Sequence, residues 1–101
     1  MNERPIPPAA LRDQNSVEML RVWVAEHQLH CSLKIGMYRQ MKIQEEVAWG
    51  TILADAARHI ARALSEEGEE SESTLLRKIV DQLNAELDTP SSAVTGGFVE
   101  S

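Results

Sequence analysis

Two segments of alternating apolar and polar side chains, joined by a short polar stretch, lie between residues 19 and 36. Side chains of a β-strand repeat every two residues, so Leu20, Val22 and Val24 fall on one side of the first segment. The second segment places four apolar side chains on one side in the same way: Leu29, Cys31, Leu33 and Ile35. The pattern predicts an antiparallel β-hairpin in which the two apolar rows share one face.

The loop of this hairpin must contain an even number of residues if both apolar rows are to stay on one face. We expect either the two residues His27-Gln28 or the four residues 26–29. In both registers Arg21 lies opposite Lys34, which is unfavourable for two like charges unless an acidic side chain joins them.

Two helices are predicted beyond the hairpin, over residues 44–66 and 73–87, because apolar residues recur there at spacings of three and four. Gly50 lies inside the first helix, which suggests a close approach by the backbone of another segment. Residues 37–43 are expected to be a linker. The acidic stretch 66–72 is too charged to bury, and Pro90 prevents continuation of the second helix.

The chain of 101 residues is long enough for one domain and too short for two. Residues 1–10 contain three prolines and are predicted to be an extended leader. Residues 11–88 form the predicted domain, and the composition of residues 89–101 predicts a flexible tail. The expected fold class is α+β, an antiparallel β-hairpin packed on two α-helices in a single small domain.

The formal net charge of −6 is unevenly distributed. Residues 1–65 carry eight basic and seven acidic side chains, whereas residues 66–101 carry two and nine. We expect no binding to nucleic acid or to a membrane, since both depend on a basic surface. The chain has no apolar run near the roughly 20 residues that span a bilayer and no secretory signal at its start, so a cytoplasmic location is expected.

Three possible metal ligands lie within five residues: His27, His30 and Cys31. Strand alternation directs His30 and Cys31 to opposite faces, which opposes a shared site. The remaining arrangement would combine the two histidines with His59 or Asp55. We favour structural roles for these histidines and a buried, inert thiol for Cys31, the only cysteine, and we expect no metal and no cofactor.

Two further groups of polar side chains are candidates for binding. Asp55, Arg58 and His59 follow one surface of the first helix, where a salt-bridged surface is favoured because spacing places no nucleophile beside them. On the less apolar face of the hairpin, Trp23 lies among Arg21, His30 and Lys34, which could bind an anionic ligand. We favour instead that a homodimer or the leader buries Trp23.

The sequence contains no Gly-rich phosphate loop, no C-x-x-C pair and no G-x-S-x-G elbow, so no catalytic residue is assigned. We predict a non-enzymatic interaction or regulatory module that self-associates as a two-fold dimer through the hairpin edges. Binding of an unidentified protein partner is compatible with this prediction. The alternative is a small-ligand or metal-binding protein, or an enzyme, that uses four side chains: His30, Asp55, Arg58 and His59.

Several short segments together carry a resemblance to known proteins: Ile6-Pro-Pro8, Leu20-Arg-Val-Trp-Val-Ala25, Leu29-His-Cys-Ser-Leu33, Gly36-Met-Tyr38, Ala48-Trp-Gly50, Leu53-Ala-Asp55 and Arg58-His59. Over residues 5–88 the chain resembles a family of short bacterial proteins catalogued only as a domain of unknown function. The resemblance implies a small bacterial protein of one domain, and it implies no activity, cofactor or catalytic residue.

Overall fold

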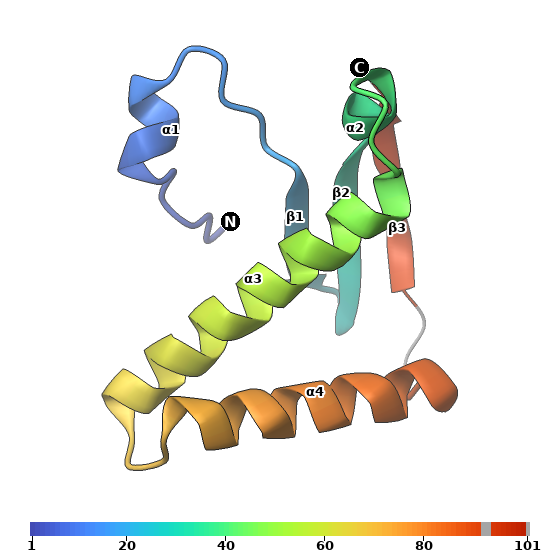
Figure 1. Ribbon diagram of the computed structural model, residues 1–101. Helices are drawn as coiled ribbons and strands as arrows, with labels where there is room; N and C mark the ends of the chain where they lie inside the picture. Colours follow the sequence, from blue (N-terminus) through green and yellow to red (C-terminus); the bar gives the residue numbers. More distant parts are fainter. Residues whose placement is uncertain (92–93, 101) are drawn as a thin grey trace.

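The computed structural model describes residues 1–91 and the backbone of residues 94–100. Its elements follow the order α1 (Pro8–Arg12), β1 (Leu20–Ala25), β2 (Gln28–Ile35), α2 (Met37–Gln40), α3 (Glu45–Glu67), α4 (Glu72–Asp88) and β3 (Val94–Glu100). Figure 1 shows the long helix α3 crossing in front of the hairpin and α4 running below it. The fold is α+β, a small single domain with an antiparallel hairpin and helices, as the sequence predicts.

The register of the hairpin keeps both apolar rows on one face, as predicted, because Leu20 pairs with Leu33 and Val22 pairs with Cys31. The loop itself is Glu26-His27, so both expected loops are wrong. These two residues have φ values of 52° and 64°. Positive φ at both central positions is the geometry of a type I′ turn, whose twist matches that of the flanking strands.

This shorter loop moves the pairing by two residues from the expected register. Arg21 therefore lies opposite Ser32 rather than Lys34. The predicted pairing of two like charges does not arise, and the apolar faces are unaffected because a shift of two preserves the alternation.

Helices α3 and α4 begin and end within one residue of the predicted ranges. The side chain of Ser71 caps α4 by accepting a hydrogen bond from the backbone N–H of Thr74 at 3.2 Å. Glu45 and Glu46 occupy the first turn of α3, where carboxylates are favoured by the helix dipole. The expected linker at residues 37–43 differs from the prediction, since it contains the short helix α2.

Both ends of the chain carry elements that composition does not reveal. Helix α1 begins at Pro8, inside the stretch expected to be extended. Proline is tolerated at the first helical position, because the backbone N–H that it lacks would have no hydrogen-bond partner within the helix. The backbone of β3 pairs in parallel with β2 and completes a sheet in the order β1-β2-β3. This strand lies in the segment for which we predict a flexible tail, and its two adjacent glycines have low strand propensity. The division into leader, domain and tail stays a prediction.

Very little of this chain is buried. Among the hydrophobic side chains of residues 1–91, only Ala61 is fully buried. The accessible surface is 8525 Å², whereas a compact monomer of 11.3 kDa exposes roughly 5,700 Å². The radius of gyration is 15.4 Å, against about 12.7 Å for a compact domain of this length. One copy of the chain therefore exposes roughly 2,800 Å² more surface than a compact monomer would.

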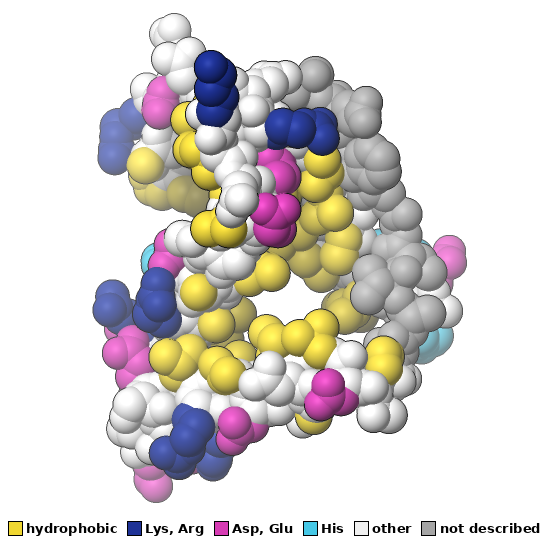
Figure 2. Space-filling view, turned by 45° about the vertical axis from the view of Figure 1, so that its right-hand side comes forward, with side chains coloured by type: hydrophobic (Ala, Val, Ile, Leu, Met, Phe, Trp, Pro, Cys, Tyr) yellow, Lys and Arg dark blue, Asp and Glu magenta, His cyan; other side chains and the backbone are white. Residues whose placement is uncertain are grey.

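The exposed apolar side chains gather on the hairpin and on the two long helices. Val22 and Val24 of β1 are 51% and 79% exposed, so the predicted packing of the apolar hairpin face on the long helix is only partial. Seven further large side chains are exposed on these two helices: Val47, Leu53, Ile60 and Leu64 of α3, and Val80, Leu83 and Leu87 of α4. In Figure 2 hydrophobic side chains surround an opening above α4, so the apolar surfaces face a hollow instead of a filled core.

Gly50 of α3 does not mark the expected close approach. Apart from its chain neighbours and the backbone of its own helix, no described atom lies within 4 Å of the position that a Cβ would take there. We predict that Gly50→Ala raises the free energy of unfolding by about 0.5–1 kcal/mol, because alanine restricts the unfolded chain and favours a helix interior. Thermal unfolding followed by circular dichroism should show a higher midpoint, and a lower midpoint would show that another surface packs on this position.

Candidate functional site

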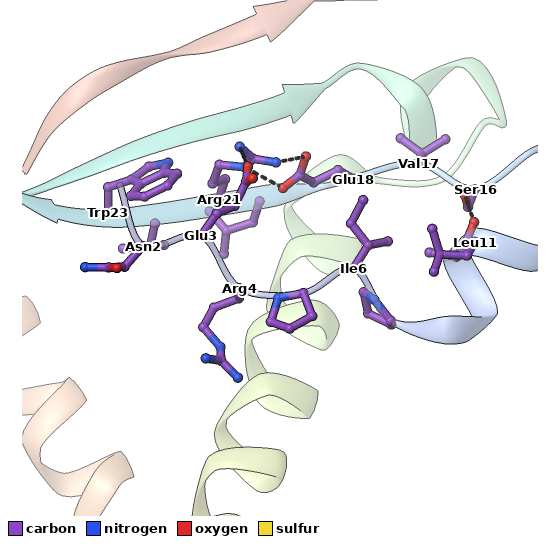
Figure 3. Close-up of a pocket in the computed structure, with 15 residues that line it drawn as sticks. Asn2, Glu3, Arg4, Ile6, Leu11, Ser16, Val17, Glu18, Arg21 and Trp23 are labelled. Atoms are coloured by element: carbon purple, nitrogen blue, oxygen red, sulfur yellow. Dashed lines mark hydrogen bonds and ion pairs between the residues drawn. The ribbon is translucent and has the colours of Figure 1, made fainter.

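The leader and α1 lie beside β1 and enclose a groove of about 670 Å³ (Figure 3). The side chains that line it include Glu3, Ile6, Leu11, Val17, Arg21 and Trp23. Among the described residues no backbone hydrogen bond joins the leader to β1. Side chains therefore hold the leader, and it does not extend the sheet.

Arg21 makes the polar contacts of this groove. Its Nε and Nη2 donate to the two carboxylate oxygens of Glu18 at 2.7 and 3.1 Å, and its Nη1 donates to Oε2 of Glu3 at 2.8 Å. The guanidinium carbon lies 5.8 Å from the ring centroid of Trp23, within the range of a cation–π interaction. The hydrogen bond from Arg21 lowers the pKa of Glu18, and the same bond raises the pKa of Arg21.

These ion pairs orient the leader more than they stabilise the fold. The side chains of Arg21 and Glu3 are 38% and 55% exposed, and solvent-exposed pairs contribute only about 0–1 kcal/mol. The two acids were not among the predicted site residues. Glu3 is 18 positions from Arg21, and Glu18 precedes the strand, so neither position follows from strand or helix periodicity.

His30 and Lys34, the other cationic candidates, occupy the strand β2. His30 lies directly across from Trp23, and its Nε2 is 3.2 Å from the carbonyl oxygen of Ala25, to which a protonated nitrogen can donate. The backbone N–H of Lys34 donates to the carbonyl oxygen of Met19 and lengthens the hairpin ladder by one bond. The strand pairing places Trp23 across from His30, and a shared site of Arg21, Trp23, His30 and Lys34 stays a prediction.

The candidates on α3 form no site with His30. Arg58 pairs with Asp55 on the exposed helix surface, and within residues 1–91 the imidazole of His59 has no hydrogen bond or ion pair. The surface groove that His30 lines includes none of these three side chains. In the described part of the chain, no three His, Cys, Asp or Glu side chains come together in a way that could hold a metal ion.

A second polar cluster, which no pattern in the sequence predicts, lies where β2 leads into α2. The carboxylate of Glu45 accepts a hydrogen bond from the backbone N–H of Gly36 and another from that of Arg39, both at 2.9 Å. These bonds, above all the one from Gly36, lower the pKa of Glu45. The indole N–H of Trp49 also lowers the pKa of Glu45. In the described chain this buried Nε1 nevertheless makes no hydrogen bond of good geometry.

The lowered pKa of Glu45 predicts a loss of stability in acid. A carboxylate whose pKa is lower in the folded state contributes fully above its ordinary value of about 4.5, and its contribution disappears as the pH falls through the folded pKa. We expect Glu45→Gln to lower the melting temperature at pH 7, and the difference from the parent to shrink below pH 4.5. Glu46→Gln is the control, because the side chain of Glu46 makes no hydrogen bond or ion pair in the described chain. An equal effect of both substitutions at every pH would contradict the prediction.

Comparison with known proteins adds a family and a structural relative. No curated protein gives a significant match. A solved structure from the photosynthetic bacterium Rhodopseudomonas palustrus CGA009, described as a "putative pyruvate dehydrogenase", is similar to this chain with a TM-score of 0.70 and 29% sequence identity. The similarity covers 94% of this chain and 92% of the other. None of the described helices has the length and apolar character needed to cross a membrane. The family profile that matches residues 3–91 is described as "Domain of unknown function (DUF5076)", and the chain belongs to this family.

Proposed function

We propose that this chain is a non-enzymatic interaction module that works as a two-fold homodimer. The observation that carries the proposal is the surface excess of roughly 2,800 Å² over a compact monomer. Obligate homodimers bury about 2,000–5,000 Å² in total, or about 1,000–2,500 Å² per chain. The excess is therefore large enough to supply an interface of the obligate class.

The exposed apolar side chains support the same proposal. A monomeric protein of this size gains most of its stability by removing such side chains from water, at about 25 cal/mol per Å². With Ala61 as the only fully buried hydrophobic residue of the described chain, one copy has little of this stabilisation. A second copy would supply it by covering the same side chains.

The polar side chains favour binding over catalysis. Both carboxylates near Arg21 are already paired with it, and Asp55 is paired with Arg58 on an exposed surface. A catalytic site needs reactive groups that converge in a concave pocket. A dehydrogenase also needs a site for an electron acceptor, and the sequence holds no Gly-rich loop for a dinucleotide, so the name of the related structure adds no activity to the proposal.

Light scattering coupled to size-exclusion chromatography tests the proposal. The chain should run at twice 11.3 kDa at micromolar concentration, and its melting temperature should rise with protein concentration, because association stabilises the folded state by mass action. A mass of 11.3 kDa across the concentration range, with a constant melting temperature, would overturn it.

A further inference from the structure

We infer that the second copy binds the apolar rows of α3 and α4, with the two α4 helices antiparallel to each other across the two-fold axis. This inference rests on the proposed self-association and names the surface that performs it. It differs from the edge pairing of hairpins that the sequence suggests.

The first observation is a continuous apolar row on α4, formed by Leu76, Val80, Leu83 and Leu87. The steps between neighbours are four, three and four residues, which keeps all four side chains on one face of the helix. Val80, Leu83 and Leu87 are 41%, 44% and 72% exposed, so exposure is greatest toward the C-terminal end. A row with this spacing is the seam that one helix presents to another.

The second observation is a matching row on α3, formed by Leu53, Ile60 and Leu64, which is also exposed. Helices α3 and α4 are in close contact with each other, so the two rows belong to one helical pair. Figure 2 shows that hydrophobic side chains of the helices and hairpin border a common opening. The surface is concave and apolar, and a partner helix would remove it from water.

The third observation concerns the competing surface, the outer edge of β1. The leader lies beside this edge and is fixed to Arg21 through Glu3. The exposed large apolar side chains of β1 are two valines, Val22 and Val24, whereas α3 and α4 carry seven, six of them in the two rows. The helical pair therefore offers the larger apolar surface, and it is the surface that the leader leaves accessible.

An antiparallel approach pairs the α4 row with its own copy. Such a contact is isologous, so each pairing occurs twice about the axis. Leu76 then lies near Leu87 of the second copy, and Val80 lies near Leu83 of the second copy. The two central residues are closest to the axis, and Leu83 approaches its own counterpart.

Disulfide crosslinking tests this arrangement in a Cys31→Ser background, which removes the native thiol. Three single variants are compared under mild oxidation: Leu83→Cys on the proposed seam, Asp81→Cys on the opposite face of the same helix, and Val22→Cys in the middle of β1. We expect the crosslinked dimer to form at least tenfold faster with Leu83→Cys than with the other two. Light scattering of each reduced variant confirms its mass before oxidation.

The outcomes separate the inference from the proposed function. Dimers that crosslink through Val22→Cys, or equally through Leu83→Cys and Asp81→Cys, would overturn the α4 seam while leaving self-association intact. A parent chain that is monomeric would contradict both the proposed self-association and the α4 seam. Fast crosslinking at Leu83 alone, with a dimeric mass in the reduced state, supports both.

Discussion

Leu83→Glu is expected to convert the homodimer to a monomer and to lower the melting temperature by at least about 10 °C. Each copy would lose the burial of one leucine, which contributes about 1.5–3 kcal/mol, and the substitution occurs twice in the dimer. The new carboxylates would also lie close to the two-fold axis, where like charges repel and desolvation opposes ionisation. For a domain of this size, each kcal/mol corresponds to roughly 4–8 °C.

Ala85→Glu is the matched control, because residue 85 is exposed and lies on the opposite side of α4 from Leu83. It introduces the same charge in the same helix, so it should leave the mass unchanged and shift the melting temperature by no more than a few degrees. The measurements are light scattering and thermal unfolding at two protein concentrations. If Leu83→Glu remained dimeric with the stability of Ala85→Glu, the α4 row would not form the interface.

Gly36→Ala should lower the melting temperature by roughly 5–15 °C, since the strain in such a backbone conformation costs about 1–3 kcal/mol. Gly36 has a φ of 104°, a conformation that side-chain-bearing residues rarely adopt. Its backbone N–H donates to Glu45, so relaxation of φ would also break the bond that anchors the start of α2. A Cβ at this position would lie 3.2 Å from the end of the flexible Arg39 side chain, which can move away, so the backbone conformation sets the cost.

Gly68→Ala is the control for this substitution. Gly68 has a φ of −130°, which any residue can adopt, and its Cβ would make an ordinary contact at 3.4 Å with the carbonyl oxygen of Leu64. We expect a much smaller change in the melting temperature. Equal melting temperatures for the two variants would show that the conformation at Gly36 is not needed for the turn between β2 and α2.

Local pattern determined the hairpin and the two long helices of this protein. The alternation between residues 19 and 36 correctly predicts the hairpin and its apolar face, because a strand's side chains repeat every two residues. Helices α3 and α4 follow from spacings of three and four, and their ends agree with the prediction to one residue. The two-residue loop was missed, since Glu26 and His27 lack the Asn-Gly or Asp-Gly signal of a type I′ turn.

The contacts of the candidate site depended on tertiary structure. Alternation alone placed Arg21, Trp23 and His30 on one side of the hairpin. Arg21 bonds to Glu3, which is 18 positions away in the sequence, and Gly36 bonds to Glu45, which is nine positions away. The periodicity of a helix or a strand does not connect residues at such separations. Likewise β3 lies beside β2 through long-range pairing, which the composition of the last 13 residues does not encode locally.

The sequence by itself determined which side chains are apolar and on which face of each element they lie. Only the tertiary structure decided that these faces border a hollow instead of a filled core, with 8525 Å² of surface on an 11.3 kDa chain. The physical reason is that periodicity specifies that a face must be covered without specifying what covers it. A row such as Leu76, Val80, Leu83 and Leu87 reads identically whether its partner is a helix of the same chain or of a second copy.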